Sequence, residues 1–308
     1  FDPVCRGAPT LGAMGSHGES TGAPSRRQLV LGGAALAGLG ACSPSSNTSS
    51  SSTGSTAGTS TPAGNEGGSI EGTFLTPTSM SAQAKPLKST HLGGGRDTKW
   101  RIELPSSTPP KSLVIMLHGA GHTADRAFEE MDLSPHVEKL GIAIAAVDGG
   151  STWWHWRDGV DGLSMVTKDL VPAALAAAKL PDSTRIGLTG YSMGGYGALL
   201  VAAELGQQRV RGIIAHAPAL FLNARESPHA FDGQSEFDEF SVWDRVDRLK
   251  DIPMWIDCGT EDPFIDNDRR FAAMVPKAKT TFEAGDHDTS VWRPHLAAQF
   301  EWLLAQPA

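Results

Sequence analysis

Short apolar segments alternate regularly with longer helix-like segments over residues 71–308, and this alternation limits the fold more than any other feature of the sequence. Seven segments have the length and the β-branched or apolar content of strands: 99–104, 113–117, 142–147, 185–189, 210–215, 254–258 and 280–283. Two of them, 113–117 and 142–147, are apolar at every position, which is typical of parallel strands covered on both faces. The sequence therefore predicts an α/β domain with a doubly wound, mostly parallel sheet and helices on both faces.

Five segments between these strands have helical character, and one segment breaks the alternation. The helix-like segments are 124–140, 163–180, 194–205, 267–274 and 291–305. The irregular segment, residues 218–242, is rich in Phe and acidic residues. We expect it to pass over the carboxyl edge of the sheet and to form at most a small lid. An irregular surface loop without a function explains the same composition equally well.

Residues 1–42 have the pattern of an export signal. Arg26 and Arg27 precede a short run of apolar and small residues that ends in Leu-Gly-Ala-Cys at Cys42. A basic head, a short apolar centre and a small-residue end are typical of a secretory signal, and the run is too short to span a bilayer. The paired arginines resemble a twin-arginine signal, and the ending resembles a bacterial lipobox in which Cys42 carries the lipid. We expect an exported lipoprotein anchored to the outer face of the cytoplasmic membrane, with simple cleavage and release as the alternative.

The composition of residues 43–70 predicts a flexible linker to the domain of residues 71–308. Fifteen of residues 43–69 are Ser or Thr and none is aromatic, so this segment lacks the apolar surface that folding requires. The sequence starts with Phe1, and we expect residues 1–13 to be an extension upstream of a start at Met14.

The charge and the cysteines of the chain exclude several classes of protein. The chain has 26 Lys plus Arg and 34 Asp plus Glu, which gives a net charge of −8. Nucleic-acid-binding proteins normally carry a basic excess, so we expect no nucleic-acid partner. The three cysteines, Cys5, Cys42 and Cys258, are too few and too scattered for a disulfide framework or a CxxC metal site. We expect neither a metal ion nor a cofactor.

The motif Gly-x-Ser-x-Gly occurs twice, and its surroundings decide which copy carries chemistry. Residues 190–194 follow a predicted strand and precede a helix of small residues, whereas residues 18–22 lie in the export signal. A sharp strand-to-helix turn exposes the central serine, and the flanking glycines avoid collisions with the neighbouring strand and helix. Ser192 is therefore the expected nucleophile, and Ser20 is not.

The residues expected to activate Ser192 follow it along the chain. A serine hydroxyl needs a base, and the base needs an acid to orient it. Among the ten histidines, His287 is the one on a loop between the last strand and the last helix. Asp262 lies on the loop after segment 254–258 and can reach the neighbouring loop of His287, with Glu261 as its main rival. The order Ser, acid, His is that of hydrolases built on a parallel sheet.

Two backbone N–H groups are expected to bind the oxyanion of the tetrahedral intermediate. One belongs to Met193, directly after the nucleophile. The other lies in the glycine-rich turn after segment 113–117, where Ala120 is the expected donor.

Four motifs stand in a fixed order along the chain: Leu-His-Gly-Ala-Gly at 117–121, Gly-Tyr-Ser-Met-Gly-Gly at 190–195, Cys-Gly-Thr-Glu-Asp-Pro-Phe at 258–264 and Gly-Asp-His-Asp at 285–288. Together they resemble the α/β-hydrolase superfamily. More narrowly, they resemble its esterase D-like branch, which includes bacterial acyl esterases, feruloyl and acetyl-xylan esterases and secreted mycolyltransferases. The resemblance covers roughly residues 95–305 and implies the α/β-hydrolase fold. It also implies a cofactor-free acyl transfer in which Ser192 forms an acyl-enzyme that water or another alcohol releases.

Candidate substrate-binding residues follow segment 142–147, on the catalytic edge of the sheet. Trp153, Trp154 and Arg157 can form an aromatic wall there for a sugar or an acyl chain, or they can pack under a loop. Tyr191, next to the nucleophile, is a further candidate. We expect a monomer that takes a small-molecule or carbohydrate acyl ester as its substrate.

These features favour a serine esterase that hydrolyses acyl esters, including esters of carbohydrates or cell-envelope components. An acyltransferase that moves the acyl group to a sugar would use the same catalytic residues, so the sequence does not separate the two. A non-catalytic envelope-binding lipoprotein on a hydrolase scaffold is the alternative from another class. The complete set Ser192, Asp262 and His287 argues against that alternative.

Overall fold

The computed structural model describes residues 86–92, 95–227 and 229–308. The predicted export signal with Cys42, the predicted linker and the start of the predicted domain lie outside these described residues. Within them, no helix has both the length and the apolar character needed to cross a bilayer.

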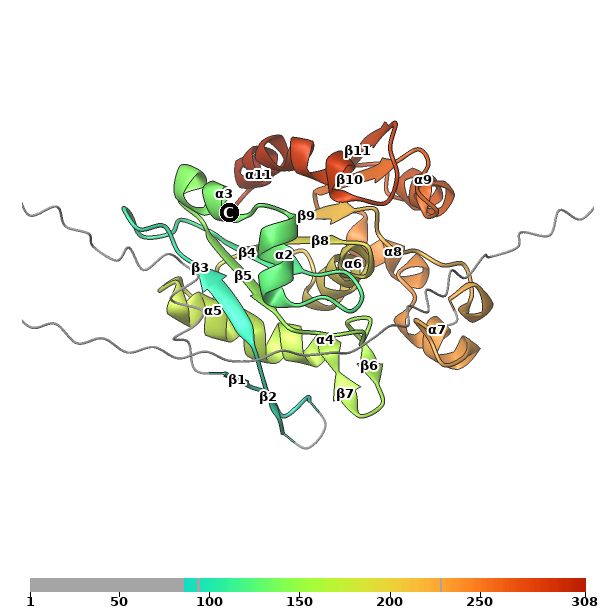
Figure 1. Cartoon of the computed structure of the whole chain (residues 1–308), viewed down its shortest axis with the longest axis horizontal. Coiled ribbons are helices and arrows are strands. Elements are labelled where there is room, and N and C mark those ends of the chain that lie inside the picture. Colours follow the sequence, from blue (N-terminus) through green and yellow to red (C-terminus); the bar gives the residue numbers. More distant parts are fainter. Residues whose placement is uncertain (1–85, 93–94, 228) are drawn as a thin grey trace, which may run out of the picture. The chain divides into compact units, whose positions relative to one another are not determined.

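A seven-stranded sheet forms the centre of the described domain (Figure 1). Its strands, in spatial order, are β11 (Ala278–Glu283), β10 (Met254–Gly259), β9 (Val210–His216), β8 (Ile186–Tyr191), β4 (Leu113–Leu117), β5 (Ala143–Val147) and β3 (Trp100–Glu103). All neighbours are parallel except β3, which runs antiparallel to β5. The seven predicted strands are thus all present, and the prediction of a mostly parallel sheet in an α/β fold is confirmed.

The side chains of the central strands divide between two cores, one on each face of the sheet. In β4, Leu113, Ile115 and Leu117 join one core, and Val114 and Met116 join the other. Successive side chains of a strand point to opposite faces, so a strand that is apolar at every position needs a cover on both. All five residues of β4 are buried, as this argument requires.

Helices provide that cover. The first core holds α4 (Gly162–Ser164), the π-helical turn η1 (Met165–Leu170), α5 (Val171–Ala177), α6 (Met193–Leu205) and α8 (Val246–Leu249). The second holds α2 (Ala124–Glu130), α3 (Ser134–Leu140), α10 (Thr289–Trp292) and α11 (Leu296–Ala305), with the 3-10 turn η4 (Arg293–His295) between the last two. Helix α9 (Ile265–Met274) contributes to both cores. The sheet is therefore covered on both faces.

Prolines divide three of the helices that the sequence predicts as continuous. Segment 124–140 forms two helices, α2 and α3. Pro135 lies in the first turn of α3, where proline is tolerated, whereas proline in the interior of one long helix would be unfavourable. The break lies at Asp132, whose φ is 48°. Pro294 likewise converts one turn of segment 291–305 to the 3-10 form, and Pro172 follows the π-helical turn of segment 163–180. The predicted extents were correct, but their continuity was wrong.

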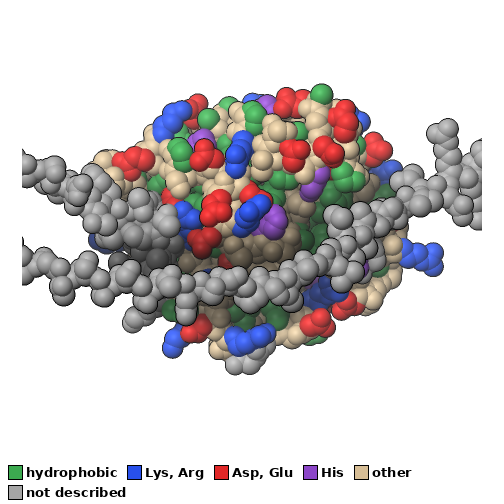
Figure 2. All heavy atoms as spheres, viewed as in Figure 1, with side chains coloured by type: hydrophobic (Ala, Val, Ile, Leu, Met, Phe, Trp, Pro, Cys, Tyr) green, Lys and Arg blue, Asp and Glu red, His purple; other side chains and the backbone are tan. Residues whose placement is uncertain are grey.

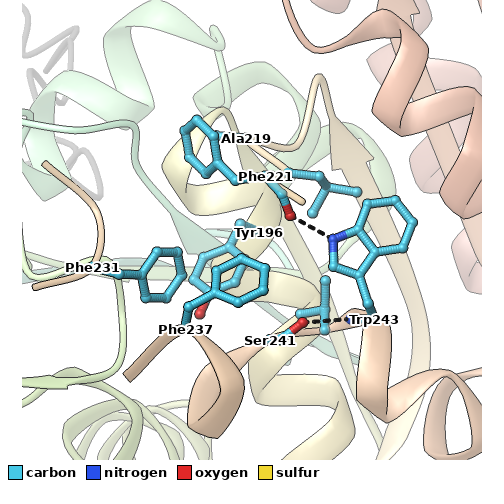
Figure 3. Close-up of a pocket in the computed structure, with 9 residues that line it drawn as sticks. Tyr196, Ala219, Phe221, Phe231, Phe237, Ser241 and Trp243 are labelled. Carbon is cyan, nitrogen blue, oxygen red and sulfur yellow. Dashed lines mark hydrogen bonds between the residues drawn. The ribbon is translucent and has the colours of Figure 1, made fainter. Parts of the chain in front are cut away.

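The segment that breaks the alternation is folded around aromatic side chains. It contains the short helices η2 (Ala224–Glu226) and α7 (Gln234–Phe240), and η3 (Trp243–Arg245) follows directly after it. Phe231, Phe237 and Phe240 are buried in the first core. Figure 3 shows Phe231 and Phe237 beside Tyr196 around a small cavity, with Trp243 on the other side. An irregular surface loop does not describe this segment, because it contains helices and its aromatic residues are part of the core.

Two small antiparallel pairs, not predicted from the sequence, complete the described elements. Strand β1 (Leu87–Lys88) pairs with β2 (Asp97–Thr98), and β6 (Trp156–Arg157) pairs with β7 (Val160–Asp161). Just before β6, the His155 ring stacks between Phe231 and Phe240 at centroid distances of 5.1 and 4.8 Å. This stack joins the aromatic segment to the loop after β5.

Trp154 fills the core beneath the loop after β5. Its side chain is completely buried, and its ring occupies the space beside Gly149 and Gly197, where an added Cβ would lie 2.5 and 2.4 Å from ring atoms. Trp154→Ala should lower the free energy of unfolding by about 3–5 kcal/mol, because the truncation leaves a cavity. Trp156 is the matched control, since it is 54% exposed and its replacement by Ala should change stability by about 0.5 kcal/mol or less. Urea unfolding followed by circular dichroism measures both, and equal effects would contradict the packing role of Trp154.

Candidate active site

Ser192 stands on a strained turn between β8 and α6. Its φ of 57° and ψ of −122° lie in a region that non-glycine residues rarely adopt. The flanking glycines make this turn possible, because a Cβ at Gly190 would lie 2.2 Å from the Gly194 carbonyl oxygen. A Cβ at Gly194 would lie 1.9 Å from the Leu117 carbonyl oxygen at the end of β4. The helix start thus lies against the end of the neighbouring strand, and the serine is the residue at the bend.

Asp262 and His287 meet on loops at the carboxyl ends of β10 and β11. Asp262 Oδ2 accepts a hydrogen bond of 2.6 Å from His287 Nδ1, and Asp262 Oδ1 accepts one of 2.8 Å from the Phe264 N–H. The Asp262 carboxylate is buried, whereas the His287 side chain is 26% exposed. The rival acid Glu261 accepts hydrogen bonds from the Gly285 N–H and the Thr260 hydroxyl instead. Of the two acids, Asp262 is the one bonded to the imidazole.

Ser192 and His287 line the same open cavity of about 370 Å³. Its lining residues are Gly119, Ala120, His122, Glu130, Tyr191, Ser192, His287, Asp288, Thr289 and Trp292. The volume falls within the range of small-molecule sites in proteins. No direct hydrogen bond joins Ser192 to His287 within the described residues, and such bonds are often loose in free enzymes.

The predicted oxyanion donors lie beside Ser192. Met193 is the first residue of α6, so its backbone N–H has no acceptor within the helix. In the turn after β4, the N–H groups of Gly121 and His122 donate to Gly150 O and Gly119 O. The Ala120 N–H has no acceptor among the residues that the structure describes, and Ala120 lines the cavity. Neither N–H group therefore has a backbone acceptor among the described residues, as an oxyanion donor requires.

His118 holds this turn in place as a neutral ring. The Gly149 N–H donates to His118 Nε2 at 2.8 Å, so Nε2 carries no proton and Nδ1 donates to Gly119 O at 2.7 Å. Desolvation by burial lowers the pKa of His118 to about 4. No role for this residue was predicted from the sequence. Its position directly before the glycine turn is the signal for it.

The four candidate substrate-binding residues have different surroundings. Tyr191 lines the cavity. Trp154 is completely buried, and Trp153 is 8% exposed and packs edge-on against Phe221. Arg157 forms an ion pair with Asp232 on the aromatic segment. Of the four, Tyr191 is the one that the described structure places at the cavity, and the two tryptophans follow the packing alternative.

The geometry agrees with comparisons to known proteins. Residues 93–303, more than half of the chain, match the family model described as "Putative esterase". The chain belongs to this esterase family. No curated protein sequence matches the esterase significantly. Membership makes carboxylic-ester hydrolysis the reaction class.

Solved structures show the same fold at low sequence identity. A ferulic acid esterase is 18% identical with a TM-score of 0.60, covering 71% of this chain and 96% of that one. An S-formylglutathione hydrolase from Agrobacterium tumefaciens is 16% identical with a TM-score of 0.60, covering 73% and 94%. The fluorophosphonate-binding serine hydrolase FphF of Staphylococcus aureus is 16% identical with a TM-score of 0.60, covering 72% and 97%. These likenesses confirm the α/β-hydrolase fold, and the family match confirms the predicted membership among the esterases.

Sequence reasoning did not single out four residues that line the cavity: His122, Glu130, Thr289 and Trp292. The Trp292 ring stacks on Tyr191 at 5.4 Å and meets the His287 ring edge-on at 5.2 Å. Glu130 ends α2, and its approach to the cavity depends on the length of that helix, which the sequence did not define. Among the described residues, no three His, Cys, Asp or Glu side chains are grouped to hold a metal ion.

The neutral state of His118 links the stability of the esterase to pH. Its folded-state pKa of about 4 lies below the ordinary value of 6.5, so the unfolded chain binds more protons between these pH values. The free energy of unfolding should therefore fall as the pH falls from 6.5 to 4, by about 3 kcal/mol from His118 alone. Urea unfolding at a series of pH values measures this loss.

His118→Gln is the control variant, since it offers an acceptor to the Gly149 N–H without a titrating group. Its stability should fall less between pH 6.5 and 4 than that of the wild type. A fall of the same size in both proteins would show that His118 does not cause it.

Proposed function

We propose that this esterase hydrolyses acyl esters through Ser192, His287 and Asp262. The observation that carries the proposal is the 2.6 Å hydrogen bond between His287 and the buried Asp262, on a histidine that shares a cavity with the strained Ser192. A nucleophile, a base and an acid that orients the base are the three parts of covalent acyl transfer.

Each proton in the reaction has a donor and an acceptor among these residues. His287 Nε2 takes the proton of Ser192 as the serine oxygen bonds to the ester carbonyl carbon. The imidazolium then gives this proton to the leaving alcohol as the C–O bond breaks, which leaves an acyl-serine. Water attacks the acyl-serine with His287 again as the base, and the acid and the free serine are released.

Asp262 acts on the base. Its Oδ2 holds the Nδ1 proton of His287, which keeps Nε2 free for the serine proton and stabilises the imidazolium. The Phe264 N–H fixes the other oxygen of the carboxylate. Two aromatic rings, Phe264 and Trp292, contact the imidazole edge-on at 5.4 and 5.2 Å and limit its rotation.

The N–H groups of Ala120 and Met193 are the proposed oxyanion donors. Both lie next to the nucleophile and have no acceptor among the described residues. The loss of one such donor typically costs about 3–4 kcal/mol of transition-state stabilisation. His118 supports this function indirectly, because it fixes the turn that carries Ala120.

We further propose that the substrates are acyl esters of carbohydrates or cell-envelope components. The cavity is open, and it is lined by polar side chains at Glu130 and His122 as well as by the Trp292 ring. A mixture of hydrogen-bonding groups and an aromatic face suits a hydroxyl-bearing substrate. A similar structure is that of a ferulic acid esterase.

Ser192→Ala should abolish both labelling by a fluorophosphonate probe and hydrolysis of p-nitrophenyl acetate, because it removes the nucleophile. Gel fluorescence and absorbance at the p-nitrophenolate band measure the two reactions. Ser20→Ala is the matched control in the second Gly-x-Ser-x-Gly sequence and should leave both unchanged. A folded wild type that the probe does not label would contradict the proposal, and so would transfer of the acyl group to added trehalose in preference to water.

We also propose that the protein is exported and anchored by a lipid on Cys42, as the arginine pair and the lipobox-like ending predict. Cys42→Ser should then abolish incorporation of labelled palmitate and release the protein from the membrane fraction of a bacterial host. The control is Cys5→Ser, which changes the other cysteine of the N-terminal region. It should keep both the palmitate incorporation and the membrane association. Membrane association that survives in Cys42→Ser would refute the anchor.

A further inference from the structure

Three polar side chains of the cavity form what we call the polar wall: His122, Glu130 and Tyr191. All three line the cavity that also holds Ser192 and His287. The wall is assembled from the turn after β4, the end of α2 and the end of β8. Figure 2 shows acidic, basic and histidine side chains gathered over α2. The catalytic mechanism described above uses none of these three side chains.

The hydrogen bonds of the polar wall assign its protons. The Tyr191 hydroxyl donates to Glu130 Oε2 at 2.6 Å. His122 Nδ1 is hydrogen-bonded to the Tyr191 hydroxyl oxygen at 3.0 Å and also lies 3.0 Å from Glu130 Oε2. Arg126 Nε donates to Glu130 Oε1 at 2.7 Å. An ionised carboxylate only accepts, so the proton of the Tyr191 hydroxyl lies in its hydrogen bond to Glu130. The hydroxyl oxygen is then the acceptor toward His122 Nδ1, which is therefore the nitrogen that carries a proton. In the neutral ring the lone pair therefore sits on Nε2, which has no hydrogen-bond partner among the described residues.

Several contacts hold Glu130 and Tyr191, the two residues of the polar wall that support His122. Burial opposes ionisation of Glu130, but the hydrogen bonds from Tyr191 and Arg126 outweigh this effect and lower its pKa. Tyr191 is 2% exposed and stacks on Trp292. Arg293 donates to the backbone carbonyls of Glu129 and Glu130, which fixes the end of α2. His122 is thus an oriented imidazole on a fixed support, with its side chain 36% exposed.

The position of the cavity assigns the part of the ester that reaches the wall. During acylation His287 gives its proton to the oxygen of the leaving alcohol, so the alcohol half lies next to His287. Asp288 and Thr289, which follow His287, line the same cavity as His122. The space between the catalytic histidine and the polar wall is therefore the space for the alcohol half of the ester.

We infer that the polar wall selects the alcohol half of the substrate, by accepting at His122 Nε2 a hydrogen bond from a hydroxyl group that the alcohol carries. This inference rests on the proposed function and adds His122 as the residue that recognises the alcohol half of the ester. Glu130 and Tyr191 are positioning residues, since they set the proton and the orientation of His122. An alcohol without a second hydroxyl leaves Nε2 unpaired when it displaces water, and a plain alkyl ester is therefore the poorer substrate.

A pair of esters that differ only in these hydroxyls tests the inference. The probes are 2,3-dihydroxypropyl acetate and propyl acetate, and the measured quantity is the ratio of their kcat/KM values, from titration of the released acid. The wild type should prefer the dihydroxypropyl ester. His122→Asn keeps an amide donor near the Nδ1 position but has no atom at Nε2, so the preference should fall about tenfold. His122→Gln extends to the Nε2 position and should keep most of the preference.

His295→Asn is the matched control, because His295 forms a similar pair with Glu283 at 2.7 Å and does not line the cavity. Its preference should match that of the wild type. A wild type without the preference, or a preference that stays within about twofold in His122→Asn, would overturn the inference while Ser192-dependent hydrolysis still stood. A wild type that neither hydrolyses p-nitrophenyl acetate nor reacts with the fluorophosphonate would remove the proposed function and this inference with it.

Discussion

The close approach of α6 to the end of β4 is the constraint on which the site depends. Gly194 lies so near the Leu117 carbonyl that no side chain fits between them, and Gly190 lies equally near Gly194. This contact sets the bend at Ser192 and brings the start of α6 beside the turn that carries Ala120. The positions of the proposed nucleophile and of both proposed oxyanion donors therefore follow from this one contact between α6 and β4. The two loops with Asp262 and His287 only have to arrive at the same edge of a parallel sheet, which its topology guarantees.

Three histidines lie near the bend at Ser192, and the hydrogen-bond partners of each one determine its role. His118 is buried between a donor and an acceptor of the backbone, so it stays neutral and structural. His287 has a carboxylate on one nitrogen and the cavity on the other, which suits a group that must gain and lose a proton. His122 also has a carboxylate, Glu130, beside its Nδ1, but its side chain is 36% exposed and its Nδ1 is hydrogen-bonded to the Tyr191 hydroxyl. The same residue type thus serves as support, proposed base and proposed hydroxyl acceptor.

The sequence predicted what depends on local pattern and chain order. Strands such as β4 can be predicted because they are apolar at every position. Ser192, Asp262 and His287 could be predicted because they lie on the turns or loops that follow predicted strands. The interruptions at Pro135 and Pro294 could also have been predicted, because proline is unfavourable in the interior of a helix. They were missed because the helical spacing of apolar residues continues across both prolines. What depends on contacts through space was not predictable. The burial of Trp154 follows from the empty space at Gly149 and Gly197, and the polar wall follows from where a short α2 ends.

The loop after β5 has a consequence for exchanging parts of this fold. The Trp154 indole N–H donates to the His118 carbonyl, and the next residue, His155, lies between two phenylalanines of the aromatic segment. Two consecutive side chains therefore couple the proposed oxyanion turn to a segment that looks dispensable in the sequence. A chimera that replaced this segment by one from another hydrolase would empty both faces of the His155 ring. An exchange of the aromatic segment between hydrolases would therefore have to include the loop after β5.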